Sequence, residues 1–154
     1  MATIEQRCLI HTDPETAFQV SQDYSCRSQW DPFAKKIQRD IDGLVSITAW
    51  HGMKMRVEYV SWHPPERAAI RMVTGPRILK RFAGSWLFSQ HGVGVVEVRF
   101  RYQIQATHNW RYLEPLMLRY FKVETWRRLK ALKRYLERSD RHKEQGGIRS
   151  ERIS

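Results

Sequence analysis

Apolar and polar side chains alternate cleanly between residues 96 and 105. One side of this segment is apolar, with Val96, Val98, Phe100, Tyr102 and Ile104, and the other is polar, with Glu97, Arg99, Arg101, Gln103 and Gln105. This period of two predicts a β-strand with one buried face and one face in water. Gly84, Trp86 and Phe88 in the preceding segment fall on the same buried side.

Turn signals divide the region from Lys35 to Ala106 into about six segments of strand length, with no helical pattern between them. These signals are Asp42-Gly43, His51-Gly52, His63-Pro64-Pro65, Gly75-Pro76 and Gln90-His91-Gly92-Val93-Gly94. Short connections join antiparallel strands, because parallel strands need a long crossover. The sequence therefore predicts an antiparallel meander.

Loop lengths suggest a register for two hairpins. A loop from Gln90 to Gly94 pairs Phe88 with Val96, Trp86 with Val98 and Gly84 with Phe100. A loop over Trp62-His63-Pro64-Pro65 pairs Tyr59 with Ala68, Val57 with Ile70 and Met55 with Met72. A slip of one residue would turn every side chain to the opposite face.

Two short helices are predicted between the first strand, over Thr3–Ile10, and this meander. Asp13 is a good N-cap and proline fits the first helical position, so a helix is expected over Pro14–Val20. A second helix is expected over Tyr24–Trp30. It should end at Asp31-Pro32, because the residue before proline avoids the helical conformation.

Residues Trp110–Leu136 form one long helical pattern that would span a small domain. Its apolar positions recur in steps of three and four, at Leu113, Leu116, Met117, Tyr120, Val123, Leu129, Leu132 and Leu136. Basic side chains occupy much of the rest: Arg119, Lys122, Arg127, Arg128, Lys130, Lys133, Arg134 and Arg138. After Ser139 the period is lost. We therefore predict one α+β domain over residues 1–138 and a basic disordered tail over residues 139–154.

Two registers stay open for the segment from Lys35 to Trp50. Two-residue turns at Asp42-Gly43 and His51-Gly52 would put Arg39, Ser46, Thr48 and Trp50 on the inner face with Tyr59. Arg39 could then hold a carboxylate, phosphate or enolate. The competing register buries Val45, Ile47 and Ala49 and leaves Arg39 in water. It is favoured, since three apolar residues prefer burial.

The composition of the chain raises the possibility of a negatively charged partner. The 154 residues carry six Trp, six Tyr and six Phe, together with a net charge of +11. Such a charge favours an acidic partner, such as nucleic acid, an anionic membrane or a ribosome. A basic solvated surface is the simpler interpretation, because the charge is spread out and much of it falls on the long helix and the tail.

Sequence motifs for metal or cofactor chemistry are missing. Cys8 and Cys26 form no CxxC pair, no His lies at metal-ligand spacing, and no phosphate-binding or dinucleotide glycine pattern occurs. We therefore expect no metal and no cofactor. The N-terminus lacks a secretory pattern and no apolar run approaches the roughly 20 residues of a membrane span, so a cytoplasmic location is expected.

Four segments resemble a known family over roughly residues 3–138. They are Pro14-Glu15-Thr16-Ala17-Phe18-Gln19-Val20, Trp30-Asp31-Pro32-Phe33, Phe82-Ala83-Gly84-Ser85-Trp86-Leu87-Phe88 and Glu124-Thr125-Trp126-Arg127-Arg128-Leu129-Lys130-Ala131-Leu132-Lys133. With the order of the elements, they resemble the START-like (SRPBCC) superfamily, of the polyketide cyclase/dehydrase and coenzyme Q-binding type. The resemblance implies a helix-grip (START/Bet v 1-like) fold, a curved antiparallel sheet wrapped around a long C-terminal helix. Members bind lipids, quinones, polyketides or hormones, some catalyse cyclisation, and related toxins bind ribosomes.

A long helix across a strongly curved sheet leaves an apolar cavity. The candidate ligand-binding residues are Trp30, Tyr59, Trp86, Phe100, Tyr102, Met117 and Tyr120. The alternative interpretation is that each of them is an ordinary core residue. Tyrosine adds a polar handle, and methionine adapts to ligand shape.

Three functions compete. The first is binding or transport of a lipid-like, quinone-like or polyketide-like molecule in the cavity. The second is a polyketide aromatase/cyclase, which needs acid–base groups in the cavity; Arg39, Tyr59 and Tyr102 are the only candidates there, so it ranks second. The third is a ribosome- or RNA-associated module. The basic C-terminal helix and tail would make that contact, or a contact with an anionic membrane surface.

Overall fold

The computed structural model describes the backbone of residues 2–153 and the side chains of residues 2–138. One strand and two short helices come first: β1 (Ala2–Ile10), α1 (Pro14–Gln22) and α2 (Tyr24–Trp30). The meander follows: β2 (Ala34–Arg39), β3 (Val45–Ala49), β4 (Lys54–His63), β5 (Arg67–Thr74), β6 (Leu79–Gly92) and β7 (Val95–Ala106). A 3-10 turn, η1 (His108–Leu113), leads into the long helix α3 (Glu114–Ile153).

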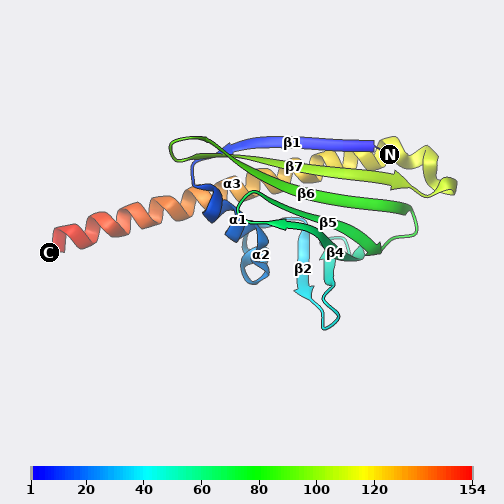
Figure 1. Ribbon diagram of the computed structural model, residues 1–154, viewed down its shortest axis with the longest axis horizontal. Helices are drawn as coiled ribbons and strands as arrows, with labels where there is room; N and C mark the ends of the chain where they lie inside the picture. The colour runs from blue at the N-terminus through cyan, green and yellow to red at the C-terminus, as the bar shows by residue number, and fades with distance from the viewer. Residues whose placement is uncertain (1, 154) are drawn as a thin grey trace.

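The strands form one seven-stranded sheet in the order β1-β7-β6-β5-β4-β3-β2. Every pair of neighbouring strands among the described residues is antiparallel. The first strand, β1, lies at one edge of the sheet and pairs with the last strand, β7. α3 contacts both of these strands. Figure 1 shows α3 running lengthwise along one face of the sheet, with α1 and α2 near one end of it. The predicted helix-grip fold is confirmed.

The predicted register of the β6–β7 hairpin is wrong by two residues. Trp86 pairs with Phe100, and Phe88 pairs with Val98. The strands extend further than predicted, so that Val93 and Gly94 alone join them, and Gly94 takes a φ of +70°. A tight turn of this kind needs positive φ, which glycine adopts without strain.

The β4–β5 register is also wrong by two residues: Tyr59 pairs with Ile70, and Val57 pairs with Met72. The pairing also shifts locally between Arg56 and Val57 and between Tyr59 and Ser61. A slip of two residues keeps each side chain on its predicted face, because successive side chains alternate. The predicted inward-facing residues are therefore correct, although the predicted cross-strand pairs are wrong.

The favoured register of the β2–β3 hairpin is confirmed. Val45 and Ala49 are buried and Ile47 is half-buried, whereas Arg39 is exposed. Arg39 nevertheless lies on the concave side, opposite Val45, with its guanidinium 6.0 Å from the ring centre of Tyr59. It stands at the rim of the concave face.

Local capping sets the short helices. The backbone N–H of Thr16 donates to the Asp13 carboxylate over 2.7 Å at the start of α1, as predicted, and the helix runs two residues past Val20. α2 matches its predicted range. The N–H of Asp31 donates to the carbonyl of Arg27 over 2.9 Å and ends the helix.

α3 differs from its prediction at both ends. η1 takes up the positions where the helix was predicted to begin, and α3 continues to Ile153, through the segment predicted to be a disordered tail. That segment is rich in Glu, Arg, Lys and Gln, which favour a helix even without an apolar stripe. The side chains of residues 139–154 lie outside the described ones. Whether the domain folds without this segment stays a prediction.

The buried face of α3 is rotated from the predicted stripe. Leu116 and Val123 are 65% and 52% exposed, whereas Arg128, expected on the basic outer face, is only 6% exposed. The buried positions are Met117, Phe121, Glu124, Thr125, Arg128, Leu129, Leu132 and Leu136. This rotation brings a guanidinium into the core. No helix in the described part of the chain combines the length and the apolar character needed to cross a membrane.

Candidate functional site

An enclosed cavity lies between the concave face of the sheet, the α1–α2 corner and α3. Its apolar walls come from β2 to β7, with Ile37, Val45, Val57 and Ile70 among them. The inward positions of the alternating strands supply these side chains, because that face is shielded from water. The space open to the centres of water molecules measures about 40 Å³. That is room for roughly three waters.

Four of the seven predicted ligand-binding residues line this cavity: Tyr59, Trp86, Phe100 and Tyr102. Trp86 meets Phe100 edge to face at 4.0 Å between ring centres, and Phe100 meets Tyr102 at 4.6 Å. The rings therefore pack on one another while presenting one side to the cavity.

Trp30, Met117 and Tyr120 do not line the cavity. Trp30 packs behind it, edge to face with Trp86 at 6.2 Å. Met117 and Tyr120 line a separate surface groove instead. The reason is their position along α3: both residues lie more than two turns before Arg128, the α3 residue that lines the cavity.

Three charged side chains form a buried cluster beside the cavity. One carboxylate oxygen of Asp31 accepts from Nε of Arg27 over 3.1 Å and from Nη2 of Arg128 over 3.0 Å. The other oxygen accepts from Nε of Arg128 over 3.2 Å and from the backbone N–H of Phe33 over 2.9 Å. Arg27 and Arg128 themselves line the cavity. Two positive charges thus share one negative charge.

Aromatic faces complete the surroundings of the two guanidiniums. Arg27 lies 5.1 Å from the ring centre of Trp30, and Arg128 lies 4.8 Å from that of Phe100 and 5.2 Å from that of Phe33. Such contacts stabilise a cation that has lost its water. They explain how arginine is tolerated at two buried positions.

The cluster fixes protonation states. Burial alone would raise the pKa of Asp31, but Arg128 and Arg27 outweigh it and hold the pKa of this carboxyl below its usual range. Burial raises the pKa of Tyr102, whose hydroxyl accepts from Nη1 of Arg128. Tyr102 is therefore a neutral hydroxyl at physiological pH.

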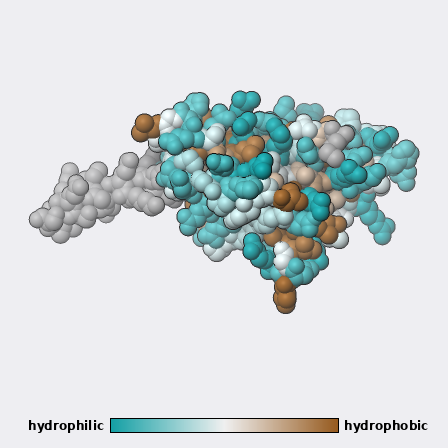
Figure 2. Space-filling model, in the orientation of Figure 1, coloured by the Kyte–Doolittle hydropathy of each residue, from teal (hydrophilic) through white to brown (hydrophobic). Residues whose placement is uncertain are grey.

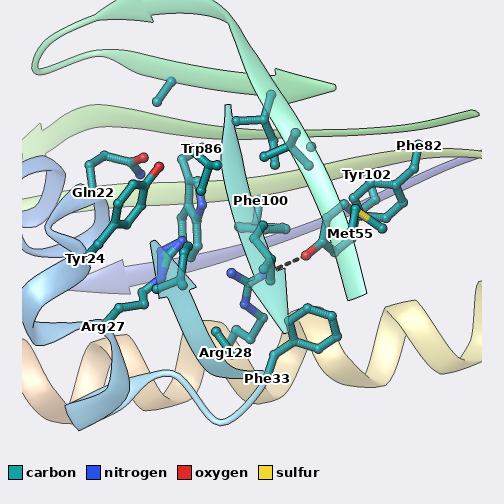
Figure 3. Close-up of a pocket in the computed structure, with 18 of the residues that line it drawn as sticks. Gln22, Tyr24, Arg27, Phe33, Met55, Phe82, Trp86, Phe100, Tyr102 and Arg128 are labelled. Carbon is teal, nitrogen blue, oxygen red and sulfur yellow. Dashed lines mark hydrogen bonds between the residues drawn. The ribbon is translucent and has the colours of Figure 1, made fainter. Parts of the chain in front are cut away.

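Uncharged polar groups gather at one end of the cavity. The hydroxyls of Tyr24 and Tyr59 are hydrogen-bonded to each other, and that of Tyr59 donates to the side-chain oxygen of Gln22 over 3.3 Å. Figure 3 shows Gln22, Tyr24 and Arg27 together on one side, with Met55 and Phe82 on the other. Burial, followed by the neighbouring Tyr24, raises the pKa of Tyr59. The cavity is thus polar at its α1–α2 end and apolar at its opposite end.

An open groove lies on the outer surface beside that apolar end. The space within it is about 620 Å³, and its lining is apolar apart from His51, Arg119 and the hydroxyl of Tyr120. Met53 lines both the groove and the inner cavity. The His51 ring and the Tyr120 hydroxyl form a hydrogen bond between the β3–β4 turn and α3. Burial raises the pKa of Tyr120 to about 12.

Arg27, Asp31 and Arg128 were not among the predicted site residues. A signal existed for each arginine. Arg27 and Asp31 are four residues apart on a helix, a spacing that places them side by side. Arg128 falls in register with Phe121 and Leu132 on one helical face, where a charged residue needs a buried partner.

The described residues around the cavity include few side chains that could act as acids, bases or metal ligands. Among the described side chains that line the cavity there is no His, Asp, Glu or Cys. Among the side chains of residues 2–138, no three His, Cys, Asp or Glu come together as metal ligands. The chemical capacity of the cavity is to bind an apolar body while offering hydroxyls, an amide and two guanidiniums to oxygen atoms.

Solved structures share this architecture at low sequence identity. A START superfamily protein from Mycobacterium smegmatis superimposes with a TM-score of 0.75 at 12% identity, covering 88% of this chain and 97% of its own. The Zhui aromatase/cyclase from a Streptomyces species gives 0.76 at 12% identity, over 89% and 94% of the two chains. A conserved protein from Geobacillus kaustophilus gives 0.74 at 11% identity, over 90% and 97%. At these identities the likeness concerns the fold alone.

The sequence itself identifies the family. No curated protein matches the chain. A family profile, however, matches residues 1–137, which include every strand and the buried part of α3. The chain therefore belongs to the polyketide cyclase/dehydrase and lipid transport family, within the START-like superfamily that its sequence resembles.

Proposed function

We propose that this protein binds a hydrophobic small molecule in the cavity and does not transform it. The observation that carries this proposal is the apolar space between α3 and the sheet, where the described lining residues include no His, Asp, Glu or Cys. Burying an apolar ligand there removes its surface from water, which is the main source of affinity in such sites.

An aromatase/cyclase activity is the second candidate. The Tyr24–Tyr59 pair and Arg27 favour it, since they could polarise a carbonyl oxygen, and the Zhui protein of the same fold is an aromatase/cyclase. General acid–base catalysis works best when the pKa of the catalytic group lies near the working pH. The raised pKa of Tyr59 makes that group a poor proton donor and base at neutral pH. Binding without reaction is therefore the stronger proposal.

The test fills the cavity and measures binding of an uncharged apolar dye, N-phenyl-1-naphthylamine. Ile47→Phe puts a larger side chain into the lining, and Ile41→Phe makes the same change on the exposed β2–β3 turn. We expect wild-type protein and Ile41→Phe to bind the dye equally. Ile47→Phe should bind it roughly tenfold more weakly, a difference of about 1.4 kcal/mol.

A thermal melt of each variant separates lost binding from lost folding, because an overpacked core costs about 1–3 kcal/mol. Equal dye binding by folded Ile47→Phe and wild-type protein would contradict binding in this cavity. Turnover of a reactive poly-β-ketone thioester, abolished by Tyr59→Phe, would favour the cyclase instead.

A further inference from the structure

The cavity and the groove together suggest what kind of molecule binds. The cavity has room for only about three waters, whereas the neighbouring groove offers about 620 Å³. We infer that the ligand is an amphiphile with a carboxylate head and a single apolar chain, held with its head at Arg27 and its chain passing Met53 into the groove. This inference rests on the proposed function, because it names the ligand class of the same cavity.

Charge selects the head group. Arg27 and Arg128 face the cavity with Asp31 between them, and Glu124 on the same side of α3 is paired with Arg127 over 2.8 Å. Glu124 is bonded by the half-exposed Arg127, so among the described residues Asp31 is the one carboxylate bonded to the two guanidiniums that face the cavity. A buried cationic donor without an acceptor is costly, so an anion that reaches such a donor gains a charge-assisted hydrogen bond.

Free donors fix where the head lies. Among the described side chains, Arg128 uses Nε, Nη1 and Nη2 in hydrogen bonds to Asp31 and Tyr102. Arg27 uses Nε toward Asp31 and Nη1 toward the carbonyl of Ser21, over 2.6 Å, and its Nη2 meets no partner within the described part of the chain. Arg27 also lies at the polar end with Tyr24 and Gln22 (Figure 3).

Shape favours a carboxylate over a phosphate, because a flat head with two oxygens is smaller than a tetrahedral one and the space beside Arg27 is narrow. Arginine also binds carboxylates through charge-assisted hydrogen bonds that are stronger than those to neutral oxygens. An alcohol or ester of the same chain would gain only the neutral hydrogen bonds.

Met53 sets the direction of the chain. It belongs to both linings, and its neighbours toward the groove are Ile78, Leu113 and Phe121, all apolar. A methionine side chain is unbranched and moves at little cost, so it can open a passage between the two spaces. Leu116 and Val123 on the outer wall are exposed, and a bound apolar chain would cover them.

The experiment titrates the full-length protein at pH 8 with dodecanoic acid, dodecanol and methyl dodecanoate, each below its aggregation limit. We expect the acid to bind roughly tenfold tighter than the other two. Arg27→Gln should abolish this preference. Arg81→Gln, which removes the same charge from an exposed position on β6, should keep it. Octanoic acid should bind more weakly than dodecanoic acid, and Leu116→Lys in the groove should remove that chain-length difference.

Three outcomes overturn the inference or its basis. Equal binding of acid, alcohol and ester by wild-type protein would leave the proposed function intact and refute the carboxylate head. Acid preference with no effect of chain length or of Leu116→Lys would refute the passage into the groove. Binding of none of the three, nor of the uncharged dye, would refute the proposed function itself. The comparison of ligands uses wild-type protein, so it stands even where Arg27→Gln does not fold.

Discussion

Asp31 holds two otherwise unpaired guanidiniums in the interior, and this single carboxylate makes the charged side of the cavity possible. It accepts from Arg27, Arg128 and the N–H of Phe33. Replacing a complete buried network by apolar residues can be neutral, but removing one member leaves charges that nothing compensates. The residue therefore joins α2, the start of β2 and α3 through one functional group.

Asp31→Asn should cost about 3–5 kcal/mol of unfolding free energy, because two buried arginines then lack a counter-charge. Urea unfolding followed by circular dichroism measures the loss. The control is Asp40→Asn, which weakens the ion pair with Arg56 near the surface and should cost much less. Equal losses in the two variants would contradict the role assigned to Asp31.

The same cluster predicts a pH dependence. The folded-state pKa of Asp31 lies below its unfolded value of about 3.9, so its contribution is fully present above that pH and is lost as the pH falls through the lower folded value. The difference in unfolding free energy between wild-type protein and Asp31→Asn should stay constant from pH 7 to about pH 4 and shrink below it. A difference that already shrinks at pH 6 would require another titrating group.

The sequence predicted aromatic residues of the cavity lining but not its buried charged residues. Tyr59, Trp86, Phe100 and Tyr102 were found because they occupy inward positions of alternating strands, and an error of two residues in register does not change a face. Arg128 was placed on the outer face because a lone arginine has no reason to be buried. Arg128 is buried because it pairs with Asp31, which lies 97 residues earlier in the chain. The residues around Arg128 in the sequence give no sign of so distant a partner.

The presence and order of the strands and helices were predicted correctly, but several of their end points were wrong. All seven strands, both short helices and the long helix appear in the predicted order, since turn residues and N-caps act locally. The β6–β7 turn is tighter than predicted because both strands extend into the glycine-containing loop. The far end of α3 is helical because its residues favour that state, although the last described buried side chain of α3 is Leu136.

Removing the residues after Ser139 should therefore leave the melting temperature unchanged. The removed segment has no apolar period, and Ile148 and Ile153 are its two large apolar residues, so little apolar surface can be lost. A Leu136→Ala variant of the shortened chain provides the contrast, and it should lose about 2–5 kcal/mol, because Leu136 is fully buried. A fall of several degrees on truncation alone would show that the segment supports the domain.

At the scale of the whole molecule, the chain is basic, with a net charge of +11, and the face seen in Figure 2 is mostly hydrophilic. Figure 2 shows small separate apolar areas on one face, including the tip where Figure 1 places the β2–β3 turn. On α3, Val123 and Trp126 are exposed beside Lys122 and Lys130, and Lys130 lies 4.7 Å from the ring centre of Trp126. Cations beside exposed rings suit the interface of an anionic membrane, so this partner stays a prediction alongside the ribosome.

Replacing Lys122 and Lys130 with Gln should weaken binding to phosphatidylserine vesicles by roughly tenfold or more, because each lysine near such a surface contributes about 1 kcal/mol. Vesicle sedimentation at low and high salt measures it, and binding should fall as salt rises. The matched control removes two charges elsewhere, with Lys80→Gln and Arg81→Gln on β6. The same loss in both pairs would mean that net charge alone attracts the protein.

The pairing of the first strand with the last has a consequence for how the chain is made. Ile10 pairs with Val96 and Ala2 pairs with Ile104, so nearly the whole sheet is encoded between the partners. At about 5–20 residues per second, a ribosome needs several seconds to supply β7 after β1 has been synthesised. During that interval the nascent β1 has no native strand beside it, and α3, which covers it, is made last of all. β1 can therefore join the native sheet only after β7 has been translated.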